Sequence, residues 1–194
     1  NKKRYAGLSW TRPDEPGKVD AKGIETVRRD WCALVRQVVD RCLHLLLKER
    51  SFDDAIGHVC ETVSALRQGR VDPRMLVISK TLVRDGAEAY DAKQAHVELA
   101  EKLRQRDPAS APKVGDRVPY VFLVGHVNTP AYARAEDPLW AIEHNLQIDA
   151  DYYIDHQLKA PLLRIFGPVL GESNVEKRLF VGEHTRRITR SAPA

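Results

Sequence analysis

At 194 residues and 22.0 kDa, with 43% hydrophobic and 30% charged residues, the chain can bury the core of one domain or of two small ones. Charged residues interrupt its most apolar region, residues 31–47, so the sequence excludes a membrane-spanning helix and predicts no membrane partner. Three cysteines, Cys32, Cys42 and Cys60, match no disulfide framework and favour a reducing interior.

The positive charge lies at the two ends of the chain. Residues 1–50 hold 12 Lys and Arg against 7 Asp and Glu, and residues 173–194 hold 5 against 2. A polyanion would therefore meet the amino-terminal quarter first. The alternative is that solvated helix faces alone produce the imbalance.

The first residues are predicted to be the end of a strand that carries a basic run. Lys2, Lys3 and Arg4 stand directly before Tyr5, with Ala6 and Gly7 behind them. Cations neutralise phosphates, a ring can press on a sugar or base, and small residues leave room for close approach, so DNA is the leading partner. The alternative is a solvated run or a targeting signal.

The strand is expected over residues 1–8, with nothing before Asn1 to pair with it, which suggests a piece cut from a longer protein. Pro13, Pro16 and Gly17 then predict a loop.

Two antiparallel helices are predicted next. Apolar residues recur at three- and four-residue steps from Ile24 to Leu46, which indicates one long amphipathic helix. Ser51, with Asp54 three residues on, predicts the N-cap of a second helix that stops at Gly69.

The middle of the chain alternates strands and a helix. We expect a strand over residues 75–83, a helix over residues 91–106 that Asp107-Pro108 ends, and a strand over residues 118–124 that pairs with the earlier one. Asp149 is predicted to cap a last helix, which Pro161 should kink. From Gly171 onward the polar, basic sequence predicts a tail or linker. The pattern as a whole indicates a mostly helical α+β fold.

No catalytic or metal-binding motif is present. The chain has neither a phosphate-binding glycine loop nor a G-x-S-x-G turn. Cys42-x-His44 and His58-x-Cys60 lie on expected helices, where positions i and i+2 point about 200° apart and cannot share one metal ion. Acidic pairs occur only where caps and turns would use them. We therefore assign no catalytic residue and no bound cofactor to this chain.

Several segments resemble the family B DNA polymerases, and in particular their delta branch. Residues 2–7 are similar to the family's KKRY motif, and residues 22–30, KGIETVRRD, to the segment that leads from palm to thumb. Residues 93–100, KQAHVELA, and residues 115–121, GDRVPYV, resemble the delta branch, as do the pair Tyr152-Tyr153 and residues 182–186, GEHTR.

The resemblance implies a domain organisation and an activity. Residues 1–22 would be the carboxyl-terminal edge of the palm, residues 23–172 the thumb, and residues 173–194 a basic linker toward a cysteine-rich module. The parent would be a DNA-directed DNA polymerase that uses Mg²⁺ in two-metal nucleotidyl transfer. The palm carboxylates that bind Mg²⁺ would lie outside this chain, so the chain alone should be inactive.

The resemblance also implies a site that grips duplex DNA. The DNA-binding residues we predict are Lys2, Lys3, Arg4, Tyr5, Arg28, Arg29, Lys80 and Arg117. Because they would touch phosphates or minor-groove acceptors, they would demand no base sequence. For Arg29, the alternative is a helix-flank ion pair with Glu25.

Primer-template DNA is the expected partner of the chain. The parent protein would add accessory subunits and a sliding clamp, and its location would be nuclear. Two alternatives remain open at this point: a non-catalytic module that docks a protein, and the equivalent region of the zeta branch, which serves translesion synthesis.

Overall fold

The computed structural model describes residues 5–12, 14, 17–24, 31–84, 86–126 and 128–181. The chain divides into two compact units. Unit 1 combines residues 1–71 with residues 150–194, and unit 2 is residues 72–149. Unit 2 is therefore an insertion in the sequence of unit 1.

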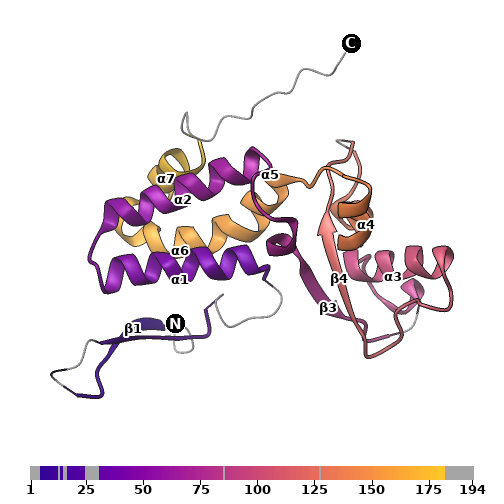
Figure 1. Ribbon diagram of the computed structural model, residues 1–194, viewed down its shortest axis with the longest axis horizontal. Helices are drawn as coiled ribbons and strands as arrows, with labels where there is room; N and C mark the ends of the chain where they lie inside the picture. Colours follow the sequence, from indigo (N-terminus) through magenta and orange to yellow (C-terminus); the bar gives the residue numbers. More distant parts are fainter. Residues whose placement is uncertain are drawn as a thin grey trace, which may run out of the picture. The chain divides into compact units, whose positions relative to one another are not determined.

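A pair of helices, α1 (Ala33–Leu47) and α2 (Phe52–Arg67), forms the centre of unit 1 (Figure 1). Val35, Val39 and Cys42 of α1 and Val59 and Val63 of α2 are at most 1% exposed. The predicted pair is confirmed, and Gly69 ends α2 with a φ of +67°. However, Cys32 is extended, so the prediction of helix from Ile24 onward is wrong at least for residues 31 and 32.

The predicted cap of α2 is confirmed. The Asp54 backbone N–H donates to Ser51 Oγ at 3.4 Å, and the Ser51 hydroxyl donates to the Asp54 carboxylate at 2.5 Å. These bonds satisfy a helix-end donor that would otherwise lack a partner.

We expect Ser51→Ala to lower the free energy of unfolding by about 1 kcal/mol, because it removes the side-chain acceptor at the helix end. Urea titration followed by circular dichroism measures the change. Ser173→Ala is the control, since the exposed Ser173 hydroxyl makes no hydrogen bond with the described residues. An equal loss of stability in both variants would contradict the capping role.

The carboxyl-terminal helices complete unit 1. α5 (Ala150–Tyr153) continues through a π-helical turn, η4 (Ile154–Leu158), into α6 (Lys159–Leu170). Because Pro161 has no N–H to donate to the preceding turn, the helix is irregular just before it. Gln157 on the π turn accepts the backbone N–H of Cys32 at 3.3 Å and so ties this helix to the start of α1.

The prediction of a tail after Gly171 is wrong for residues 172–180. α7 (Glu172–Val175) and the π-helical η5 (Glu176–Phe180) follow α6 directly. Val175 and Leu179 are fully buried. The segment as a whole is polar in composition, so its composition does not reveal these two buried apolar residues. Arg67 of α2 donates to the backbone carbonyl of Phe180 at 3.2 Å and holds η5 in place. Residues 182–194 of the predicted linker lie outside the described residues.

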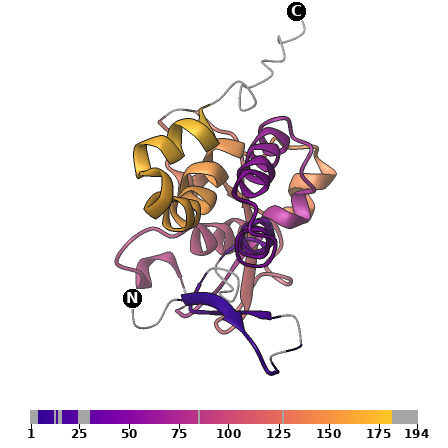
Figure 2. The same ribbon diagram turned by 90° about the vertical axis from the view of Figure 1, so that its left-hand side faces the viewer.

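A two-stranded hairpin, β1 (Tyr5–Ser9) and β2 (Lys18–Lys22), belongs to unit 1 and contacts α1. Figure 1 and Figure 2 both show it alongside that helix. The predicted strand is confirmed over residues 5–8, but it does have a partner, which the sequence analysis missed. The partner begins directly after Gly17 and alternates charged with small or apolar residues, KVDAK.

Unit 2 is built on a three-stranded antiparallel sheet of order β3–β4–β5: β3 (Ile78–Thr81), β4 (Arg117–Phe122) and β5 (Ala135–Glu136). The predicted pairing of the first two strands is confirmed, but the first strand covers only residues 78–81 of the predicted 75–83, because residues 75 and 76 belong to a 3₁₀ helix. Ile78, Val118 and Tyr120 are at most 3% exposed and face the core of the unit.

Helices contact this sheet. α3 (Ala95–Arg106) contacts all three strands, and α4 (Pro138–Glu143), which the sequence analysis missed, contacts β4. Short 3₁₀ helices connect these elements: η1 (Pro73–Leu76), η2 (Ala87–Ala89) and η3 (Ala131–Arg134). The expected mostly helical α+β fold is confirmed. Within the described residues, no helix combines the length and apolar composition needed to cross a bilayer.

Candidate nucleic-acid interface

The hairpin presents Tyr5 on a face that also carries charge. Tyr5 is 48% exposed, stands opposite Lys22 in the strand register, and donates its hydroxyl proton to Asp20 at 3.2 Å. The hydrogen bond with Tyr5 and the attraction of Asp20 raise the pKa of Lys22. Side chains on one strand alternate between faces, so Lys18, Asp20 and Lys22 share this face.

Lys18 and Lys22 are cations that the sequence analysis missed. Both are exposed, and together with Tyr5 they define what we call the hairpin face. The signal that could have found them is the alternation of residues 18–22, which becomes informative only once a hairpin partner is recognised.

Gly7 leaves open space on the hairpin face. It lies opposite Asp20, and a Cβ placed on it would meet no atom of the described residues within 4 Å. The chain's own packing therefore does not require glycine at this position.

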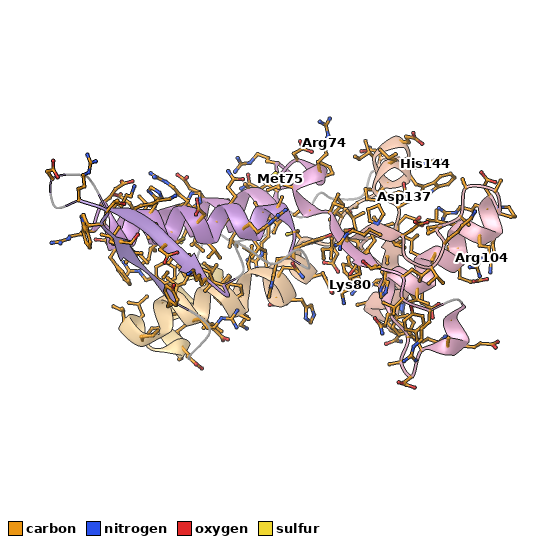
Figure 3. All side chains as sticks on the ribbon, turned by 90° about the horizontal axis from the view of Figure 1, so that it is seen from below. Arg74, Met75, Lys80, Arg104, Asp137 and His144 are labelled. Atoms are coloured by element: carbon orange, nitrogen blue, oxygen red, sulfur yellow. The ribbon has the colours of Figure 1, made fainter. Side chains whose placement is uncertain are left out.

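Lys80 and Arg117 lie on adjacent strands but on opposite faces of the β3–β4 pair. Lys80 stands opposite Val118, whereas Arg117 stands opposite Thr81, and neighbouring residues on a strand point to opposite sides. Lys80 is exposed and its ammonium makes no hydrogen bond or ion pair with the described residues (Figure 3). Arg117 is exposed too, but its Nε donates to Ser79 Oγ at 3.1 Å. The structure thus does not unite these two predicted contacts on one face.

A buried histidine stands beside Lys80. His96 at the start of α3 is 3% exposed, its Nδ1 makes no hydrogen bond, and its ring packs edge-on against Tyr90. Burial, with the nearby positive charge of Lys80, lowers the pKa of His96. Its position in the core agrees with a structural role.

Five of the predicted DNA contacts lie outside the described residues: Lys2, Lys3, Arg4, Arg28 and Arg29. They stay predictions of the sequence. Of the eight predicted contacts, the structure describes Tyr5, which is in unit 1, and Lys80 and Arg117, which are in unit 2.

Other cations of unit 2 are held by the chain itself. Arg106 donates to both carboxylate oxygens of Glu136 at 2.8 and 2.9 Å. Lys102 donates to the backbone carbonyls of Ala133 and Ala135, and Arg134 pairs with Asp149. Asp149 directly precedes α5, where a cap was predicted, and its carboxylate also pairs with Arg134. These cations stabilise unit 2 and are less able to meet a phosphate.

The two cysteine and histidine pairs lie on the neighbouring helices α1 and α2. Burial raises the pKa of Cys42 to about 12, so its thiol stays protonated. Among the described residues, no three His, Cys, Asp or Glu side chains converge as metal ligands would.

The chain belongs to DNA polymerase family B. The family model described as "DNA polymerase family B" matches residues 1–169, which is most of the chain. A family B DNA polymerase of the hyperthermophilic archaeon Pyrobaculum calidifontis has a similar structure, with a TM-score of 0.65 and 30% identity over 84% of this chain and 20% of that chain.

The resemblance to the delta branch is also confirmed. The chain is 54% identical to the DNA polymerase delta catalytic subunit of Drosophila melanogaster over 97% of its length, and 50% identical to that of Glycine max over 100%. The corresponding subunit of Candida albicans is 51% identical over 100% of the chain. The chain spans only 17% or 18% of the length of these relatives.

Proposed function

We propose that this chain is the thumb, with the adjoining edge of the palm, of a replicative DNA polymerase, and that it grips the primer-template duplex. The observation that carries the proposal is the 54% identity, over 97% of the chain, to a delta catalytic subunit. Family B polymerases extend primers on duplex DNA, and the basic amino-terminal quarter suits contact with such a polyanion.

In the proposed complex the hairpin face lies against the sugar-phosphate backbone. Lys2, Lys3 and Arg4 supply charge just before β1, Lys18 and Lys22 supply it from β2, and Tyr5 supplies an aromatic surface. Cations and a ring read no base edges, so the grip would tolerate every template sequence, as replication requires. Lys80 is a second, separate phosphate contact on unit 2.

The remaining parts of the function belong to the longer polypeptide. We infer that Mg²⁺ ligands and nucleotidyl transfer reside in a palm outside this chain, and that accessory subunits and a sliding clamp bind the parent protein. Because a replicative DNA polymerase of a eukaryotic cell acts on nuclear DNA, we infer a nuclear location for the parent protein. Imaging a fluorescent fusion of the parent protein would test this.

The experiment that tests the grip is a fluorescence anisotropy titration of labelled primer-template DNA over a series of salt concentrations. Binding should weaken as salt rises, with a slope that reports the number of phosphates contacted, and it should be equal for unrelated template sequences. A docking module for proteins would show no salt-sensitive binding, and that outcome would overturn the proposal.

Gly7→Ala separates the fold from the grip. We expect little change in the free energy of unfolding, because the added methyl group meets no atom of the part of the chain that the structure describes within 4 Å. We expect DNA affinity to fall about three- to tenfold, since a close contact there would cost roughly 1 kcal/mol.

Gly57→Ala is the matched control, because a methyl group added to Gly57 in α2 would also have no neighbouring atom within 4 Å. It should stabilise the helix by roughly 0.5–1 kcal/mol and leave DNA affinity unchanged. If Gly7→Ala bound DNA as tightly as the parent chain, the result would contradict a close approach of the DNA to the protein backbone at Gly7.

A further inference from the structure

Among the described residues of unit 2, four of the seven exposed large apolar side chains fall on one short segment. Leu139, Trp140, Ile142 and Leu146 are 69%, 39%, 46% and 37% exposed and fall within eight consecutive residues. We name these four residues the α4 patch. An isolated exposed side chain such as Val83 needs no partner, but several exposed apolar side chains on one short segment are a candidate interaction surface.

The α4 patch is held rigidly. The carboxylate of Asp137 accepts the backbone N–H groups of Leu139 and Trp140, both at 2.9 Å, and so fixes the start of α4. The Trp140 ring lies 4.5 Å from the Arg106 guanidinium and stacks on the His144 ring with centroids 3.8 Å apart. A preorganised aromatic side chain loses little conformational entropy on binding, which is typical of an interface hot spot.

The charge around the patch favours a protein over a nucleic acid. Asp137 at the start of α4 and Glu143 at its end are negative, and Glu136 offsets the charge of Arg106. Figure 3 marks the two ends of this segment by Asp137 and His144. A polyanion would be repelled here, whereas a surface with an apolar centre and Lys or Arg at its rim would be attracted.

We propose that the α4 patch docks on such a surface elsewhere in the same polymerase polypeptide. This rests on the proposed function, which makes the chain part of a longer protein. In the delta relatives the matching region is 17% or 18% of the chain, so more than four-fifths of their residues lie elsewhere. A surface tethered in the same polypeptide reaches millimolar effective concentration and would cover the patch before a separate molecule does.

The test is site-specific photo-crosslinking in the full-length polymerase. Benzoylphenylalanine replaces Leu139, the most exposed member of the patch, and mass spectrometry locates the adduct. The control places the same group at Val83, which is 68% exposed and outside the patch. Mixing isotopically light and heavy protein separates contacts within one polypeptide from contacts between two copies.

We expect the Leu139 site to crosslink within one polypeptide, outside residues 1–194, and the Val83 site to give no defined adduct. Adding Ile142→Asp should cut the yield about tenfold, the effect of losing one hot-spot side chain. An adduct to a second copy, to an accessory protein or to unit 1 of this chain would overturn the inference, as would no adduct or an unchanged yield. The salt dependence of DNA binding by the same preparation reports on the proposed function separately.

Discussion

Replacing Lys2, Lys3 and Arg4 together by Ala in the full-length polymerase should weaken primer-template binding roughly a hundredfold at 0.1 M salt, because three phosphate contacts and their released counterions are lost. The plot of log affinity against log salt should become less steep by about 2.7, or 0.9 for each contact. The loss should be the same for unrelated template sequences, since these side chains would contact the backbone rather than base edges. Processivity should fall with affinity.

The control for this experiment changes the net charge equally at another place. Lys48, Arg50 and Arg70 are exposed cations in the turns that follow α1 and α2, and none of them is among the predicted contacts. Their joint replacement by Ala should alter the salt slope by much less. If the two triple variants had the same slope, general charge rather than a local grip would explain the binding, and the predicted role of the basic run would be wrong.

Glu136→Gln should destabilise unit 2 by about 2–3 kcal/mol. Glu136 has a side chain only 9% exposed and forms a two-pronged ion pair with Arg106, whose side chain is 35% exposed. Removing the carboxylate charge leaves a partly buried guanidinium without its counter-charge. We place the cost below the 3–5 kcal/mol typical of a fully buried pair, because water still reaches Arg106. Urea denaturation near neutral pH measures it.

The same ion pair predicts how stability depends on pH. Burial alone would raise the pKa of Glu136, but hydrogen bonds from Arg106 and the Asp137 backbone N–H, with attraction to Arg106 and Lys102, outweigh it and lower the pKa. The folded protein therefore binds this proton less readily than the unfolded chain does. The stabilisation is complete above the ordinary glutamate pKa of 4.5 and is lost as the pH falls through the lower pKa of the folded state.

An exposed ion pair on α3, the helix that carries Arg106, provides the comparison. Glu101 and Arg104 lie 3.2 Å apart on α3 with side chains 40% and 37% exposed. Glu101→Gln should lower the free energy of unfolding by only about 0.3–0.5 kcal/mol. The decrease in stability of the protein at acidic pH should remain as it is in the unchanged chain. In Glu136→Gln, by contrast, the free energy of unfolding should decrease less as the pH falls, because the carboxylate that takes up the proton is gone. If the two substitutions lowered the free energy of unfolding equally, the ion pair of Glu136 would stabilise the protein no more than an exposed pair does.

The sequence predicts an element well where the local pattern agrees with the final environment. The cap at Ser51 and the stop at Gly69 depend on a few neighbouring residues, and both are confirmed. The α1 stripe and the alternation of residues 118–122 mark surfaces that any packing would bury, so the helix pair and the β3–β4 pairing followed from them.

The errors occur where distant residues decide the local structure. The strand β2 has a weak pattern and is stabilised by hydrogen bonds to β1, while η5 is held by Arg67, more than a hundred residues away. In each case an interaction partner outside the local window outweighs a modest local propensity.

The candidate nucleic-acid interface also has some features that the sequence predicts and others that only the tertiary structure reveals. The sequence alone determined the family, through motifs such as KKRY, and the concentration of positive charge at the amino terminus, because both are written in consecutive residues. Only the tertiary structure decided that Lys18 and Lys22 share a face with Tyr5, that Lys80 and Arg117 point apart, and that apolar side chains of α4 remain exposed. Strand register and burial arise from pairing between distant segments, and no local pattern of residues encodes which side of a sheet a neighbour will occupy.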